Sequence, residues 1–306
     1  MPRGNLDPDF TLEVYEADKA YYGTTILADN HNPDKPRIIE VNMLGEIIWE
    51  YLVPENLRQY TNPGFDVEPL ASGNILFVLP RNGVYEIDRS GKVVWSFLDG
   101  KVSHDADRLT NGNTLVVWGG GDTTNDPQVR EITPDGKTVW AWYAKDYFNV
   151  SPYKEISEEG WTHTNAAVRL QNSNTLISLR NFNFVVEVDP KGAIVKTIGK
   201  GVVKYQHDPE VLPNGNILLV DHNEPQRAIE IDGNGIIAWE FIVPRQLIRD
   251  ANRLPNGNTL ITGSMKIIEV TPQGKVVWQF GLKMTLGKDD GAARGFYKAE
   301  LLIPSK

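Results

Sequence analysis

All five histidines of the chain fall at or beside two positions that a repeated turn motif defines. The first position lies five residues before the leucine that opens the motif, and the second lies four residues after the leucine that closes it. Histidines scattered through a core or over a surface would not share this spacing. The first position holds, in chain order, Phe65, His104, Asn165, His207, Arg249 and Lys298. The second position holds His31, Pro80, Gly119, Arg180, His222 and Ser264, and His163 lies two residues before Asn165.

These residue types predict a site for an anion. Imidazoles gathered with Arg180, Arg249 and Lys298 make a local positive cluster, and buried cations without a partner are costly. We therefore expect a bound sulfate, phosphate or carboxylate. Imidazole also brings chemistry of its own, because the neutral ring is a nucleophile and a general base near neutral pH.

Two alternating motifs run along nearly the whole chain. The first is a leucine-flanked turn, usually Asn-Gly, which is a strong signal for a β-hairpin because both central residues tolerate positive φ. Its copies are residues 70–76, 109–115, 170–176, 212–218 and 254–260. The second motif has a Glu five residues before a Gly, and in all copies but one a Trp four residues after that Gly. Its copies are residues 39–49, 85–95, 130–140, 186–196, 229–239 and 268–278, and the fourth has Lys196 in place of the Trp.

Each repeat unit is thus two hairpins, or four strands, and the glutamates recur every 39 to 56 residues. This is the length of a propeller blade, so six copies predict an all-β, six-bladed β-propeller. A β-sandwich or two separate domains would not explain six copies with one internal spacing. A helical solenoid is excluded because the apolar residues alternate with period two.

The first blade, which starts at residue 23, lacks its innermost strand. Residues 298–304 match residues 207–213 in register, so we expect the last strand to complete the first blade and close the ring. We expect one propeller domain over residues 21–306. Residues 1–20 precede the repeat, and we expect this N-terminal extension to pack on an outer edge.

The two turns of every unit lie at one end of the blade, so the starts of the innermost strands gather at the other end around the axis. The long connections 119–128, 143–160 and 281–295 are also predicted at that end. Short turns on one face and long loops on the other are typical of a scaffold with one functional face. We expect the two histidine-bearing positions to form a cationic funnel there.

Composition limits the partners. The chain has 306 residues and a net charge of −9, so we expect neither nucleic acid nor an anionic membrane as a partner. It has no Cys and no apolar run long enough to span a bilayer. The N-terminus shows no signal-peptide core, so we expect a cytoplasmic protein, or a periplasmic or secreted one whose leader has been removed.

Several features have structural explanations. We expect the repeated Trp residues and glutamates to join neighbouring blades, and the aspartates that follow the first position to point to the other side of the strand. His31, His222, Arg249 and Lys298 are either anion ligands or structural residues. A cationic ring repels a divalent ion, so we expect no metal site. Neither a nucleotide-binding loop nor a Ser-nucleophile elbow is present.

Over about residues 20–304 the pattern resembles the arylsulfotransferase family, six-bladed propellers that move sulfuryl groups without the nucleotide donor PAPS. The resemblance rests on residues 23–30, on the Gly-x-x-x-Trp strand ends and on the His-Asp-x-x-x-Leu-Pro-Asn-Gly-Asn repeats. More specific are His207 in Gln-His-Asp-Pro-Glu-Val-Leu-Pro, the pair His163-Thr-Asn165, and Arg180 later in the same blade. The chain departs from the longer periplasmic members in having neither their additional N-terminal β-domain nor a cysteine.

The resemblance implies that His207 is transiently sulfated, with His104, His163, Asn165 and Arg180 assisting. It implies ping-pong transfer from an aryl sulfate donor to a phenolic acceptor without a cofactor. We further expect aromatic residues of the insert to hold the aryl ring, chiefly Tyr147 and Trp161, together with Tyr143 and Phe148.

Two other hypotheses about the function remain. In the first, the propeller is not an enzyme and binds an anionic ligand or a protein partner on the same cationic face. In the second, it is a metal hydrolase of the lactonase type, whose activity would be lost to a chelator. The sequence leaves the oligomeric state open.

Overall fold

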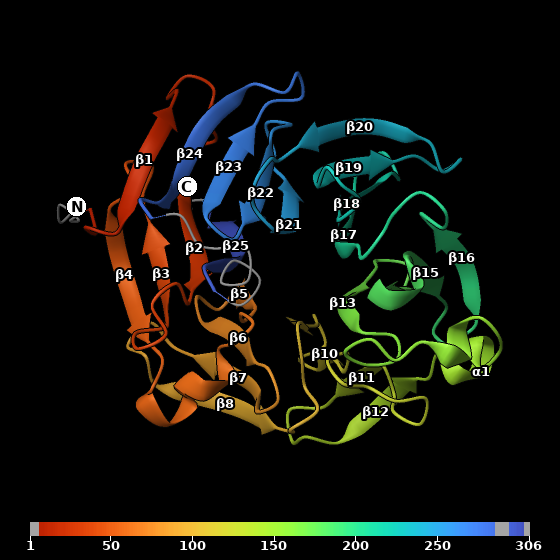
Figure 1. Cartoon of the computed structure of the whole chain (residues 1–306). Helices are drawn as coiled ribbons and strands as arrows, with labels where there is room; N and C mark the ends of the chain where they lie inside the picture. Colours follow the sequence, from red (N-terminus) through yellow and green to blue (C-terminus); the bar gives the residue numbers. More distant parts are fainter. Residues whose placement is uncertain (1–5, 285–293, 303–306) are drawn as a thin grey trace.

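Six antiparallel sheets surround one axis, as the repeat predicts (Figure 1). The structure is a computed structural model that describes residues 6–284 and 294–302. Each sheet is one blade of four strands, and the last blade has a fifth. The chain is therefore an all-β, six-bladed propeller. None of the helices within the described residues is long and apolar enough to cross a membrane.

The ring is closed at both ends of the chain. From the axis outward, the first blade consists of β25 (Phe296–Leu302), β2 (Thr24–Asp29), β3 (Arg37–Val41) and β4 (Ile47–Leu52). The last consists of β21 (Ile248–Arg253), β22 (Thr259–Gly263), β23 (Lys266–Val270), β24 (Val276–Leu282) and β1 (Phe10–Tyr15). The C-terminal strand thus completes the first blade as predicted, although residues 303–304 of the predicted strand lie outside the described residues. The N-terminal strand β1 forms the outer edge of the last blade.

The four blades between them follow the chain without exchange of strands. The second contains β5 (Val67–Pro69), β6 (Ile75–Leu79), β7 (Gly83–Ile87) and β8 (Val93–Leu98). The third contains β9 (Ala106–Arg108), β10 (Thr114–Val117), β11 (Val129–Ile132) and β12 (Thr138–Trp142). The fourth contains β13 (Thr164–Arg169), β14 (Thr175–Leu179), β15 (Phe184–Val188) and β16 (Ile194–Ile198). The fifth contains β17 (His207–Val211), β18 (Ile217–Asp221), β19 (Arg227–Ile231) and β20 (Ile237–Ile242).

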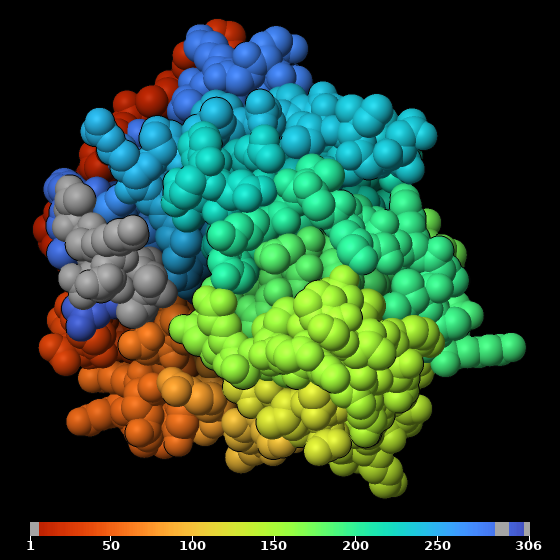
Figure 2. All heavy atoms as spheres, turned by 45° about the vertical axis from the view of Figure 1, so that its right-hand side comes forward, coloured from red at the N-terminus to blue at the C-terminus, as the bar shows by residue number. Residues whose placement is uncertain are grey.

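Helical structure is confined to connections between and within blades. The elements are α1 (Lys145–Phe148) and the short 3-10 helices η1 (Glu55–Tyr60), η2 (Tyr153–Glu155) and η3 (Arg180–Phe182). The insert that carries α1 and η2 is the yellow-green mass on the surface in Figure 2. The predicted connection 281–295 lies largely outside the described residues.

The repeated residues join one turn of a blade to one of its strands and then bind the next blade. In the fifth blade, Asn216 Nδ2 donates to Glu230 Oε1 at 2.6 Å, which links the first turn to β19. The other carboxylate oxygen of Glu230 accepts from Arg253 of the last blade at 2.8 Å. The indole of Trp239 donates to the Pro272 carbonyl of that blade at 3.0 Å. At ring closure Trp278 donates in the same way to Met43 O at 3.0 Å. The predicted interblade role is confirmed for Glu230, Trp239 and Trp278, whereas Glu187 binds Asn172 and Asn174 of its own blade.

The core is divided among the blade interfaces. Among the described residues, six clusters of buried apolar side chains lie one between each pair of neighbouring blades. Phe65, which the sequence alignment placed on the axis, is fully buried in the cluster between the first and second blades. The space around the axis is left to polar side chains.

Candidate active site at the propeller axis

Polar side chains from all six blades surround a small cavity at the axis. Its free volume is about 20 Å³, room for one or two water molecules. A molecule the size of an aromatic ring would not fit inside it. The cavity is lined by Asp66, His104, Asp105, Asn165, His207, Asp208, Arg249, Asp250, Tyr297 and Lys298.

The backbone is left-handed at several residues of this site. His104 has a φ of 53°, His163 of 47°, Tyr205 of 45° and Asp208 of 46°. Such angles are unfavourable for residues with a Cβ, and they concentrate at functional sites. They also break the alternation of side chains at the strand starts, and the pairing of β17 with β18 shifts register between His207 and Glu210.

His207 carries the lone pair that a nucleophile needs. Its Nδ1 lies 2.8 Å from the carbonyl of Tyr205, and because a carbonyl only accepts, the proton is on Nδ1 and Nε2 is free of it. Burial lowers the pKa of His207 well below 6.5, and the neighbouring His222, Arg180 and His104 lower it further. The ring is therefore neutral at physiological pH.

His222 stacks on His207, with ring centroids 4.4 Å apart and an angle of 27° between the planes. Its Nε2 donates to the carbonyl of Ile248 at 2.6 Å, so its own lone pair is on Nδ1. Burial lowers its pKa to about 4. The hydrogen bond to Ile248 opposes this shift, and the charges of Arg249 and Arg180 add to it. His222 thus supports the ring of His207 without adding charge.

A second stacked pair comes from the third and fourth blades. The centroids of His104 and His163 are 4.8 Å apart, at 30°. His163 Nδ1 donates to the Glu159 carbonyl at 3.1 Å, which leaves the Nε2 lone pair free to accept a proton. Burial and then Arg180 lower its pKa to about 4. Its loop is held by Asp122, whose carboxylate accepts the backbone N–H groups of Thr162 and His163, both at 3.1 Å.

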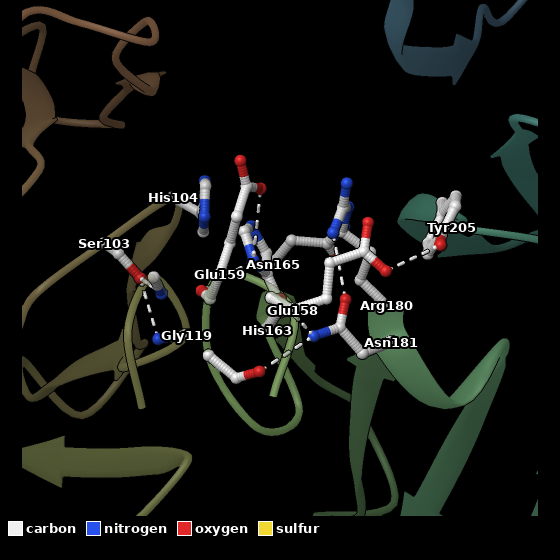
Figure 3. A network of polar contacts seen from close by, with 12 residues as sticks. Ser103, His104, Gly119, Glu158, Glu159, His163, Asn165, Arg180, Asn181 and Tyr205 are labelled. Atoms are coloured by element: carbon white, nitrogen blue, oxygen red, sulfur yellow. Dashed lines mark hydrogen bonds and ion pairs between the residues drawn. The ribbon is translucent and has the colours of Figure 1, made fainter. Parts of the chain in front are cut away.

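The charge of Arg180 acts on all four histidines of the site and lowers the pKa of each. Its guanidinium lies over the ring of Tyr205, 4.5 Å from the centroid, and donates to Asn181 Oδ1 at 2.9 Å (Figure 3). The Tyr205 hydroxyl donates in turn to Glu158 at 2.9 Å. Within the described residues no carboxylate forms an ion pair with Arg180, so its charge remains available to an anion.

Asn165 joins the fourth blade to the fifth. Its amide nitrogen donates to the carbonyl of Gln206, the residue before His207, at 2.8 Å. The other amide atom, Oδ1, is buried and without a hydrogen-bond partner in the described structure, as is Nε2 of His104. Both residues line the cavity, and buried polar atoms of this kind are uncommon unless a ligand or water satisfies them.

The axis also has an acidic layer, which the sequence argument placed wrongly. Asp66, Asp105, Asp208 and Asp250 line the cavity beside the histidines instead of pointing to the other side of the strand. The left-handed residues and the register shift break the period of two on which that expectation depended. The ring is therefore not purely cationic. In the part of the chain that the structure describes, no three of its acidic residues and histidines are arranged to hold a metal ion.

Lys298 belongs to this acidic layer. Its ammonium lies 3.3 Å from Asp66 Oδ1, 3.4 Å from Asp208 Oδ2 and 3.9 Å from Glu300 Oε1. Burial disfavours the charged form, but Asp208 and Asp66 outweigh it and raise its pKa well above 10.5. Lys298 is thus a counter-ion for carboxylates. Arg249 is also buried at the axis, where it donates to the Pro63 carbonyl at 2.9 Å and lies over the ring of Tyr297.

Of the predicted residues, His163, Arg180 and His222 belong to the histidine cluster but do not line the cavity itself. Three others lie away from both. His31 binds Asp29 at 2.7 Å, and its ring packs against Phe10 of the N-terminal strand. Trp161 is 3% exposed, and its indole donates to the Tyr153 carbonyl. Tyr147 donates its hydroxyl to the Gly192 carbonyl at 2.8 Å. The aromatic residues of the insert mainly pack against one another and the fourth blade, because together they bury an apolar cluster.

Sequence reasoning missed Tyr205, Tyr297 and Asp122. Tyr297 directly precedes Lys298 in the closing strand, so the alignment of that strand placed it next to the axis. Tyr205 acts through its backbone carbonyl and its ring face, and left-handed non-glycine residues have no signature in a sequence. Asp122 lies in a loop that is outside both motifs.

Comparisons with known proteins agree with this architecture. A protein of unknown function from Bacteroides caccae is 20% identical, with a TM-score of 0.61, over 87% of this chain and 96% of that one. Virginiamycin B lyase from Staphylococcus aureus is 14% identical, with a TM-score of 0.57, over 90% of each chain. At these identities the likeness concerns the fold alone. No curated protein matches the chain.

The family comparison is more specific. Residues 12–201 match the family model described as arylsulfotransferase (ASST), and this stretch is more than half of the chain. It includes His104, His163, Asn165 and Arg180. The chain belongs to the arylsulfotransferase family.

Proposed function

We propose that the protein moves a sulfuryl group from an aryl sulfate to a phenol without PAPS, through a sulfated His207. The observation that supports the proposal most directly is the charge and the proton position of the His207 imidazole. It is buried beside Arg180, its pKa is lowered, and its Nδ1 proton is committed to the Tyr205 carbonyl. A neutral ring with a free Nε2 lone pair beside an unpaired guanidinium suits attack on a sulfate ester.

In the first half-reaction, the Nε2 lone pair of His207 forms a bond to sulfur while the bond from sulfur to the aryl oxygen breaks. The aryl oxygen leaves as a phenolate, which takes its proton from solvent. Arg180 stabilises the negative charge on the sulfuryl oxygens. Because the other histidines are neutral, the site matches the single negative charge of a sulfate ester.

In the second half-reaction, the acceptor phenol gives its proton to the Nε2 lone pair of His163. Its oxygen then forms a bond to sulfur, the nitrogen–sulfur bond breaks, and the lone pair returns to His207. His163 is suited to this role because its Nδ1 proton is held by the Glu159 carbonyl. Its proton passes to solvent before the next turnover.

The test is release of nitrophenolate from p-nitrophenyl sulfate with phenol as acceptor, in wild type, His207→Gln and His31→Gln. Rapid-quench mass spectrometry should find one sulfuryl group on a peptide containing His207 when donor is supplied alone. We expect His207→Gln to lose activity by about 1,000-fold or more. His31→Gln is the matched control, because His31 lies away from the cavity.

Several results would overturn the proposal. They are equal activity in His207→Gln and wild type, sulfuryl mass on another residue, or tight sulfate binding without turnover of any aryl sulfate tested. The last result would favour a propeller that only binds anions. Loss of activity to a chelator would instead favour a metal hydrolase.

A further inference from the structure

His104 differs from the other histidines of the site in the partner that it has. His163, His207 and His222 each bind a backbone carbonyl, which only accepts hydrogen bonds. His104 Nδ1 instead lies 2.8 Å from the hydroxyl of Tyr297, a group that can donate or accept. The direction of this bond decides which nitrogen of His104 carries the proton.

The partners of Tyr297 settle the direction. Burial raises the pKa of Tyr297 to about 12, although the charge of Arg249 opposes the shift, so its hydroxyl keeps its proton. His104 Nδ1 is the single hydrogen-bond partner of that hydroxyl within the described structure. The proton must therefore point to Nδ1, and the proton of the neutral imidazole must be on Nε2.

The resulting Nε2–H is a donor without an acceptor. Nε2 of His104 is buried and has no hydrogen-bond partner in the part of the chain that the structure describes. A buried donor left unpaired costs free energy, which a negatively charged oxygen in the cavity would recover. The other two histidines that face the reaction, His163 and His207, have lone pairs at the same nitrogen. One donor and two acceptors are thus prepared before substrate binds.

The closing strand holds Tyr297 firmly in place. Tyr297 is 9% exposed in β25, and the guanidinium of Arg249 lies 4.6 Å from its ring centroid. The ring also packs against Gly64, where an added Cβ would be only 2.1 Å from Tyr297 Cδ2. The strand that closes the propeller therefore also fixes the orientation of one histidine at the site.

We propose that Tyr297 is a positioning residue that holds His104 as the Nε2–H tautomer, so that His104 donates to an oxygen of the sulfuryl group transferred at His207. This inference rests on the proposed function for the identity of the group bound. The tautomer itself, and its effect on binding of inorganic sulfate, are independent of turnover.

The test compares Tyr297→Phe with wild type and with Tyr85→Phe. Tyr85 is a matched control because it is a buried tyrosine in the second blade whose hydroxyl binds Asn82, away from the axis. Long-range ¹H–¹⁵N spectra of histidine-labelled protein report the tautomer of each of the five rings. Sulfate titrations and initial rates complete the set.

In wild type we expect Nε2–H for His104 and Nδ1–H for His163 and His207. In Tyr297→Phe the His104 signals should shift toward a mixture of tautomers, sulfate affinity should fall about tenfold, and kcat/KM for the aryl sulfate should fall by at least as much. Tyr85→Phe should change none of these. Adding His104→Gln to Tyr297→Phe should cost little more than His104→Gln alone, because the tyrosine acts through the histidine.

An Nδ1–H tautomer for His104 in wild type would overturn the proposal, as would unchanged sulfate affinity in Tyr297→Phe. Additive effects in the double variant would show that Tyr297 acts independently of His104. A wild-type protein that binds sulfate through His104 but transfers nothing would refute the enzymatic function and leave the tautomer assignment standing.

Discussion

Two layers of buried ionisable groups share the propeller axis, and burial acts on them in opposite directions. In the histidine layer, formed by His104, His163, His207 and His222, burial and the nearby guanidinium groups lower every pKa. In the carboxylate layer, burial raises the pKa of Asp66, Asp105, Asp250 and Glu300, although Lys298 opposes the shift. Burial therefore disfavours the charged form in both layers, for the same physical reason.

The difference is in what each layer does with its remaining polar groups. The carboxylates accept hydrogen bonds from neighbouring blades: Asp105 accepts from the N–H of Ala167 at 2.7 Å, and Glu210 from that of Arg253 at 2.8 Å. They thereby satisfy N–H groups at the free edges of the innermost strands. Within the described residues, the histidine layer keeps free lone pairs, an Nε2 without a hydrogen-bond partner and a guanidinium without an ion pair. The carboxylate layer therefore joins neighbouring blades, whereas the histidine layer has polar groups available to a ligand.

The largest expected effect is on the carboxylate layer. Replacing Lys298 by Met removes the cation that Asp66 and Asp208 face, and leaves buried carboxylates without it. We expect Lys298→Met to lose about 3–5 kcal/mol of the free energy of unfolding, measured in urea at pH 8. The folded fraction should keep a nitrophenolate release rate close to that of wild type. Two results would contradict separate roles for the two layers. One is an unchanged free energy of unfolding, and the other is loss of nitrophenolate release in a variant that remains folded.

The next effect is on the histidine layer. Replacing Arg180 by Gln removes the unpaired guanidinium, so we expect nitrophenolate release to fall about 100-fold with little loss of stability. Arg169→Gln is the matched control, because Arg169 of the same blade binds Glu131 across a blade interface at 2.9 Å. It should lower the melting temperature and spare the rate. The reverse pattern would show that Arg180 is structural.

The smallest expected effect is on the pH dependence of stability, to which the two layers contribute in opposite directions. Folded His163 and His222 have pKa values of about 4, below the 6.5 of a free histidine, so the stability that their neutral form contributes is present above pH 6.5 and lost as pH falls toward 4. Glu68 and Glu300, with folded values of about 8 and about 7, contribute in the opposite sense. Their stabilisation is present below the unfolded value of 4.5 and is lost as pH rises toward 8.

Stability should therefore decline on both sides of an intermediate pH. Glu68→Gln still accepts the N–H of Arg108 but cannot ionise. We expect it to flatten the alkaline decline by up to about 1.4 kcal/mol per pH unit and to leave the acid decline unchanged. Urea unfolding at a series of pH values measures both sides. A change on the acid side would contradict the assignment of Glu68 to the alkaline limb.

The sequence by itself determined the scaffold. The spacing of Glu, Gly and Trp set the number of blades and their turns, because hairpins depend on a few neighbouring residues. All six glycines of the second motif have φ between 75° and 89°, as such turns require. The match of residues around Lys298 to those around His207 identified the closing strand. The same spacings selected His104, Asn165 and His207, which do line one cavity.

Only the tertiary structure decided what those side chains meet. It turned Asp66 and Asp208 toward the axis and paired Lys298 with these carboxylates. It placed Trp161 in an apolar cluster and left Tyr147 exposed, with its hydroxyl on the Gly192 carbonyl. It also brought Tyr297 to His104 across 193 residues of sequence. A repeat pattern specifies which strand of a blade faces the axis, because turns between neighbouring residues determine the order of the strands. Proton positions, counter-ions and left-handed backbone angles depend on groups that meet only when the ring closes.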